Sequence, residues 1–80
     1  MPTSAVKFDA TAVNVTVKDD RLVVILADGR ALAAPLTWFP RLLEASTEQR
    51  SNWRLIGRGR GIHWPDIDED ISVASLLRAA

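Results

Sequence analysis

The stretch GIHWPDIDED, residues 61–70, holds the densest group of side chains that could do chemistry. The only histidine of the chain, His63, stands beside Trp64. Four carboxylates follow: Asp66, Asp68, Glu69 and Asp70. Histidines and carboxylates at this density bind metals, transfer protons in catalysis or dock a basic partner. They are also typical of a strand end followed by a helix start.

The spacing argues against a metal site. Asp66, Asp68 and Asp70 match the residues that open a calcium-binding loop. The sixth position of that loop would be Ile71, where glycine is needed, and the twelfth would be Leu77, where a bidentate glutamate is needed. The chain has no cysteine, and one histidine holds zinc only if several carboxylates converge on it. We therefore expect no metal and no cofactor.

A catalytic role would pair His63 with Asp66 or Asp68 as an oriented general base. Neighbouring residues of a strand point to opposite faces, and Pro65 breaks the regular path between these side chains. The chain has no cysteine nucleophile and no G-x-S-x-G motif. We therefore expect no catalytic residue and no enzymatic activity.

The acidic run before the last apolar segment has a structural and a docking interpretation. Ser72 is expected to cap a helix that ends at Ala79, and carboxylates just before a helix face the positive end of its dipole. One helix start does not need three acids, so a surplus acid beside an exposed Trp64 would form a protein-docking patch. The candidate partner-binding residues are therefore Trp64, Asp68, Glu69 and Asp70.

The glycine-rich stretch Gly57–Gly61 gives an alternative function. Arginines that interleave with aromatic residues are typical of single-strand nucleic-acid binding. The glycine spacing does not match a phosphate-binding loop, and a hairpin turn with solvated arginines is the favoured explanation of this stretch. The net charge of zero also argues against a dedicated nucleic-acid binder. The candidate nucleic-acid surface consists of Arg54, Arg58, Arg60 and His63.

The first half of the chain predicts a three-stranded meander. Residues 12–18 alternate between apolar and polar types, which predicts a half-buried strand with its valines on one side. Residues 21–26 form a continuous apolar run, which predicts a central strand buried on both faces. Asp28-Gly29 predicts a type I′ hairpin turn, and residues 31–35 predict an edge strand that ends in proline.

The second half predicts short helices and strands. Residues 40–45 predict a helix that begins with proline. Ser46 or Thr47 is expected to cap a second helix, with a glutamine at the capping-box position. Strands are expected at 54–56 and 62–64. The fold expected is one small α+β domain over residues 1–80, with a further strand or hairpin, a C-terminal helix and disorder at residues 1–4.

The composition also leads to expectations about the cellular location of the protein and about the burial of its tryptophans. The absence of cysteine fits a cytoplasmic protein, and the N-terminus has no signal-peptide pattern. The longest apolar run, Leu22–Ala27, is too short to span a bilayer, so we expect no membrane association. Trp38 and Trp53 are expected in the core, because a domain this small needs large side chains to close it.

The segments PLTWFPRL, GRGIHWPDIDEDISV and SLL occur in an order and spacing that is similar to a small bacterial family catalogued as domain of unknown function 2442. The resemblance runs from about Val13 to Ala79. It implies an α+β domain without an accepted active site. In this family some relatives are joined to a helix-turn-helix domain, and others are encoded beside another small protein. The resemblance therefore implies a link to toxin–antitoxin pairs.

We therefore expect a non-enzymatic, cytoplasmic protein-interaction module, in its most specific form the antitoxin-like half of a two-protein system. The expected partner is a small protein encoded by a neighbouring gene, and a homodimer is a further expectation. The alternative is a weak RNA- or DNA-binding protein that uses the arginine and tryptophan surface.

Overall fold

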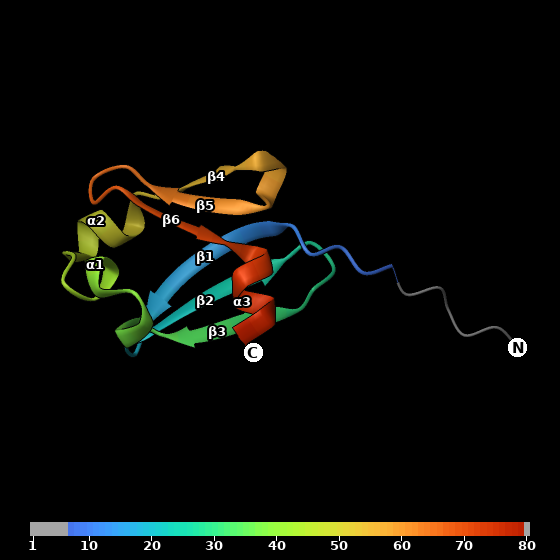
Figure 1. Cartoon of the computed structure of the whole chain (residues 1–80), viewed down its shortest axis with the longest axis horizontal. Coiled ribbons are helices and arrows are strands. Elements are labelled where there is room, and N and C mark those ends of the chain that lie inside the picture. The colour runs from blue at the N-terminus through green and yellow to red at the C-terminus, as the bar shows by residue number, and fades with distance from the viewer. Residues whose placement is uncertain (1–6, 80) are drawn as a thin grey trace, which may run out of the picture.

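The computed structural model describes residues 7–79, which form two antiparallel sheets joined by short helices (Figure 1). The first sheet is a meander of β1 (Ala12–Lys18), β2 (Arg21–Leu26) and β3 (Ala31–Pro35), with β2 in the centre. This confirms the predicted meander and the proline at the end of its edge strand. The predicted disorder of residues 1–4 lies outside the described residues.

The two turns of this meander differ from the prediction in their geometry. A type I′ turn needs a positive φ at both central residues. Asp19 and Asp20 have φ values of 52° and 62°, so the type I′ geometry belongs to the β1–β2 turn. In the β2–β3 turn Gly29 has a φ of 94°, whereas Asp28 does not have a positive φ. The predicted hairpin is confirmed there, but its predicted turn type is wrong.

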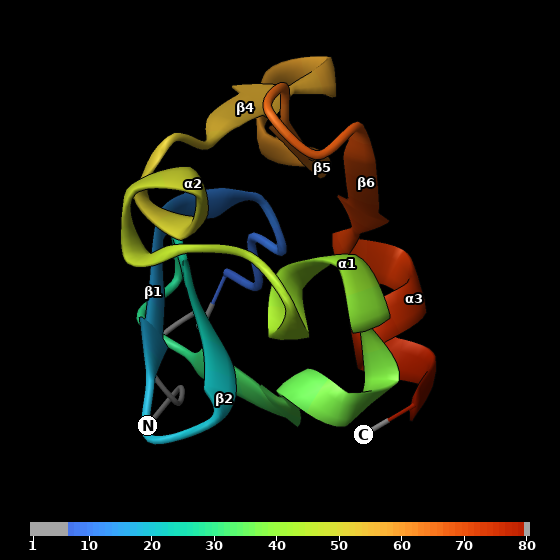
Figure 2. The ribbon, with the colours of Figure 1, turned by 90° about the vertical axis from the view of Figure 1, so that its left-hand side faces the viewer.

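The exposure of the first sheet also differs from the prediction. Val23 and Ile25 of β2 are only half-buried, because α1, α3 and the second sheet all lie on one side of the first sheet (Figure 2). Burial of β2 on both faces is therefore a wrong prediction. Val13 is 52% exposed, because a bulge between Ala12 and Asn14 interrupts the alternation of β1.

Three short helical segments connect the sheets. They are the 3₁₀ turn η1 (Leu36–Trp38), α1 (Pro40–Leu43) and α2 (Thr47–Ser51). The hydroxyl of Ser46 accepts a hydrogen bond from the Gln49 N–H at 3.1 Å, and the Gln49 side chain accepts one from the Ser46 N–H at 2.9 Å. This is the predicted capping box, which satisfies two N–H groups at the start of α2.

The second sheet is also a meander. It consists of β4 (Arg54–Ile56), β5 (Gly61–Trp64) and β6 (Glu69–Ser72), and the 3₁₀ turn η2 (Gly57–Gly59) links the first two strands. The chain then forms α3 (Val73–Ala79). The α+β fold and the C-terminal helix are confirmed. The sequence did not predict β6, because an acidic run lacks the apolar alternation of a strand.

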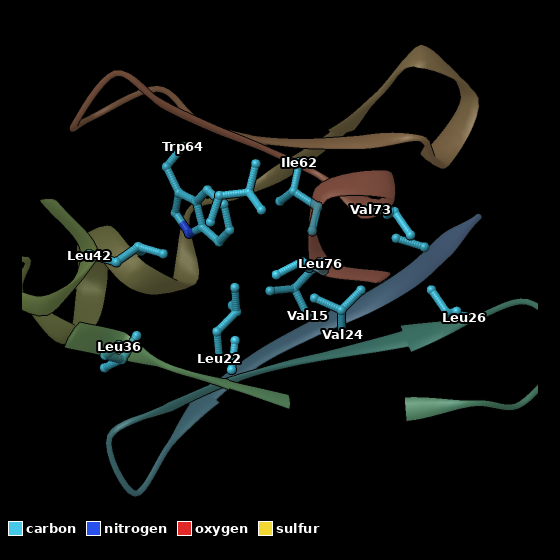
Figure 3. Close-up of a cluster of buried hydrophobic side chains, with 13 residues drawn as sticks. Val15, Leu22, Val24, Leu26, Leu36, Leu42, Ile62, Trp64, Val73 and Leu76 are labelled. Carbon is cyan, nitrogen blue, oxygen red and sulfur yellow. The ribbon is translucent and has the colours of Figure 1, made fainter. Parts of the chain in front are cut away.

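The core lies between the two sheets (Figure 3). Trp64 and Ile62 point from the second sheet toward Val15 and Leu22 of the first. The largest fully buried side chains are Trp64, Leu22, Leu26, Leu36, Leu42, Ile62 and Val24. Among the helices in residues 7–79, none has the length and apolar character needed to cross a membrane.

A close contact at Gly59 fixes the second sheet against the first. Gly59 is buried and has a φ of 85°. A Cβ at this position would lie 2.9 Å from the backbone oxygen of Ala12 and 3.0 Å from the Cβ of Thr11. Because both the space and the φ favour glycine, this residue lets η2 approach the start of β1.

Candidate interaction surfaces

Trp64 is completely buried and cannot anchor a partner. Its exposed fraction is 0%, and its Nε1 donates a hydrogen bond to the backbone oxygen of Arg50 at 3.0 Å. Ile62 and Trp64 stand two residues apart in β5, so both point into the core. The prediction of an exposed aromatic anchor at this position is therefore wrong.

The acids at the tip of the β5–β6 hairpin make contacts within the chain. The Asn52 side chain, which follows α2, donates a hydrogen bond to the Asp66 carboxylate at 3.0 Å. Arg41 of α1 donates to the backbone oxygen of Asp68, where the chain has a φ of 50°. These two bonds and the Trp64–Arg50 bond tie the hairpin to both short helices.

Contrary to the prediction from the sequence, Asp68, Glu69 and Asp70 do not interact with the N-terminus of α3. Ser72 caps α3 as expected, since its hydroxyl accepts a hydrogen bond from the Ser75 N–H at 3.1 Å. Asp68, however, lies in the hairpin turn, Glu69 and Asp70 lie in β6, and the first turn of α3 contains no acid. The predicted interaction of these acids with the helix dipole is wrong. Their role in partner binding stays a prediction.

Arg54, His63 and Asp70 form one cross-strand row on the outer face of the second sheet. The Nδ1 of His63 contacts the Oδ1 of Asp70, and the two side chains are 27% and 66% exposed. From the sequence, Asp66 or Asp68 was the carboxylate partner that a catalytic His63 would need. The strand register instead places Asp70 opposite His63. Within residues 7–79, no group of three or more His, Cys, Asp or Glu side chains is arranged to hold a metal ion.

The structure brings together only part of the candidate nucleic-acid surface. Arg54 and His63 are direct neighbours, but Asp70 completes their row and adds negative charge. Arg58 lies at the tip of η2 with a φ of 58°, and Arg60 lines a groove beside α3. The four residues therefore divide between the sheet face, the η2 tip and the groove.

Trp38 is the exposed tryptophan of the chain. Its exposed fraction is 51%, although the sequence placed it in the core. Leu36 and Leu42 are fully buried and Phe39 packs against the core, so they occupy the space that Trp38 was expected to fill. The Trp38 ring meets the Phe39 ring edge-on, with centroids 6.5 Å apart. Leu43 of α1 is 40% exposed.

Asp28 secures the segment that precedes β1. Its carboxylate accepts hydrogen bonds from the Arg30 Nε at 3.0 Å and from the Asp9 N–H at 2.8 Å. The Arg30 side-chain hydrogen bond is the main reason that the pKa of Asp28 falls to about 2. The same bond raises the pKa of Arg30. The Arg30 guanidinium also lies 5.3 Å from the centre of the Phe8 ring, a cation–π contact.

Comparisons with known proteins agree with this fold. The crystal structure of a protein of unknown function from Rhodospirillum rubrum is similar to this chain, with 28% sequence identity and a TM-score of 0.74. The similarity covers 86% of each chain. The search of curated proteins found no match. The family model described as protein of unknown function (DUF2442) matches residues 12–80. Since this match covers nearly the whole chain, the protein belongs to the DUF2442 family.

Proposed function

We propose that the protein is a non-enzymatic module that binds a small protein partner, and that Trp38 is the centre of the binding surface. The observation that carries this proposal is the 51% exposure of Trp38. Exposing half of a large indole ring to water is unfavourable, and burying the ring against a partner removes this free-energy cost. Tryptophan is also enriched among the residues that dominate binding energy.

The surroundings of Trp38 fit a docking surface. Leu43 adds exposed apolar area on the neighbouring helix, and Glu44 beside it is exposed. Arg41 connects α1 to the hairpin tip that carries the exposed Asp68. Specific interfaces commonly combine an apolar centre with a polar rim. The acids at this rim would favour a partner with a basic rim, so Asp68 keeps its proposed role while Trp38 replaces Trp64 as the anchor.

The proposed partner is the product of a neighbouring gene, with this protein acting in the cytoplasm as the antitoxin-like half of the pair. Support for a protein partner comes from the chemistry of the surface: indole and leucine side chains lose water favourably against another apolar surface. Nucleic-acid binding has weaker support, because Asp70 lies in the same row as Arg54 and His63.

The test is co-expression with the product of the neighbouring gene, followed by size-exclusion chromatography. The parent protein is expected to elute with that product as one complex. The Trp38→Ala variant should elute separately, whereas Ile56→Ala, which removes a side chain that is 40% exposed on β4, should still elute as the complex. No complex with the parent protein, or equal complex formation by Trp38→Ala, would overturn the proposal.

A further inference from the structure

The one Asp-Gly pair of the chain, Asp28-Gly29, lies in the β2–β3 turn. In such a pair the backbone nitrogen of the glycine can attack the Cγ of the aspartate, because glycine has no side chain that hinders the approach. A C–N bond forms, and one carboxyl oxygen leaves as water with the amide proton and the carboxyl proton. The product is a five-membered succinimide. A water molecule then opens this ring at either carbonyl, which restores aspartate or leaves isoaspartate.

The folded turn holds both reacting groups in hydrogen bonds. The Gly29 N–H donates to the backbone oxygen of Leu26 at 3.0 Å. The carboxylate of Asp28 accepts from the Arg30 N–H at 3.1 Å through Oδ1 and from the Asp9 N–H at 2.8 Å through Oδ2. The Arg30 guanidinium also pairs with Oδ2, at 2.8 Å. The attack on Cγ therefore requires that the carboxylate leaves several donors and that the Gly29 nitrogen leaves its acceptor.

The ionisation and the burial of the Asp28 side chain oppose the reaction further. The protonated carboxyl is the reactive form, because an ionised carboxylate is a poor electrophile. The hydrogen bond from the Arg30 side chain is the main reason that the pKa of Asp28 falls from 3.8 to about 2. At pH 5 this shift lowers the protonated fraction about 60-fold relative to an unperturbed aspartate. The side chain is only 4% exposed, so water has little access to open a ring.

We infer that Asp28-Gly29 is a latent site of isoaspartate formation, which the hydrogen bonds of the carboxylate keep unreactive in the folded protein. Isoaspartate adds one carbon atom to the backbone and moves the free carboxylate to the α position. The acceptor of the Asp9 N–H is then displaced, so the modification releases residues 7–11 from the turn. The inference is independent of the proposed function, because the turn lies at the end of the molecule opposite η1 and Trp38 (Figure 1).

The test is prolonged storage of the protein at pH 5, followed by trypsin digestion. Cleavage after the two flanking arginines gives a peptide of residues 22–30, whose aspartate and isoaspartate forms are separated by chromatography and identified by mass spectrometry. The folded parent should form isoaspartate at least about tenfold more slowly than the parent in urea, where the turn is open. Arg30→Gln removes the guanidinium and keeps the backbone N–H. It should react about tenfold faster than the folded parent.

Two control variants separate the turn contacts from charge and from global unfolding. Arg58→Gln makes the same change in η2 and should react like the parent. Val24→Ala weakens the core at a fully buried position but keeps the turn contacts, so it should react more slowly than Arg30→Gln. In the modified parent, hydrogen exchange of the Asp9 amide, followed by NMR, should become faster.

Four results would overturn the inference. The first is equal isoaspartate formation by the parent in buffer and in urea. The second is that Arg30→Gln reacts no faster than Arg58→Gln. The third is that Val24→Ala reacts faster than Arg30→Gln, which would assign the reaction to global unfolding. The fourth is unchanged exchange of the Asp9 amide in the modified protein, which would show that the segment before β1 is not released.

Discussion

The buried indole of Trp64 and the backbone oxygen of Arg50 are joined by a hydrogen bond of 3.0 Å, which links the centre of the second sheet to α2. Arg50 in turn donates from its side chain to the backbone oxygens of Leu42 and Leu43, both at 2.9 Å. Trp64 therefore contributes to stability through its volume in the core and through its hydrogen bond to α2.

Trp64→Phe should lower the free energy of unfolding by roughly 2–4 kcal/mol. The smaller ring leaves a cavity, and the Arg50 oxygen loses its donor. Trp53→Phe is the matched control, because Trp53 is only half-buried at the edge of the core. It should cost less than about 1 kcal/mol. Urea unfolding measures both values, and equal losses for the two variants would contradict the role assigned to Trp64.

The β1–β2 turn contains stored backbone strain that can be relieved. Asp19 and Asp20 both have positive φ, which costs energy for a residue with a Cβ. The double variant Asp19→Asn, Asp20→Gly places the residues preferred in a type I′ turn at these two positions. It should raise the free energy of unfolding by about 0.5–1 kcal/mol. A lower melting temperature for this variant would show that the turn has another geometry.

The close contact that Gly59 makes between the two sheets can be tested by mutation, with Gly57 as the control position. Both have positive φ, 85° and 59°, but a Cβ at Gly57 would meet only the Arg60 Cβ, at 3.6 Å. Gly57→Ala should therefore cost about 1 kcal/mol from the backbone conformation alone. Gly59→Ala should cost more than about 2 kcal/mol, because its Cβ also overlaps the start of β1. Thermal unfolding compares them, and similar losses would exclude the close approach.

The ion pair between Asp28 and Arg30 predicts a pH dependence of stability. The pKa of Asp28 is lowered from 3.8 to about 2, mainly by its hydrogen bond with Arg30. A lowered pKa means that the ionised carboxylate favours the folded state. This contribution is fully present above pH 3.8 and is lost as the pH falls through 2. The difference in unfolding midpoint between the parent and Asp28→Asn should thus shrink from pH 5 to pH 2, and a constant difference would contradict this role.

The elements that sequence reasoning found are those with strong local signals. The capping box at Ser46 and Gln49 and the proline at the start of α1 act within a few residues, so their geometry follows from local chemistry. The strand register of the second sheet, in contrast, does not follow from local chemistry. β6 contains one apolar core residue, Ile71, and forms because β5 offers it a complementary edge. The partner of His63 therefore could not be read from spacing alone.

The tryptophans show a second limit. Trp64 shares a strand face with Ile62, and this spacing of two residues could have predicted its burial. Trp38 has no such signal, because its exposure depends on how Leu36 and Phe39 pack against elements far away in the sequence. The groove beside α3 also could not be predicted from the sequence, because its walls come from residues 8–11, Arg60 and α3, which are far apart in the chain.

The central claim is that Trp38 anchors a protein partner, and isothermal titration calorimetry with the purified product of the neighbouring gene tests it most directly. Trp38→Ala should weaken the affinity by at least about 30-fold, which corresponds to a loss of roughly 2 kcal/mol. Ile56→Ala should stay within about threefold of the parent. If Trp38→Ala binds with the affinity of the parent while remaining folded, Trp38 is not the anchor and the claim is contradicted.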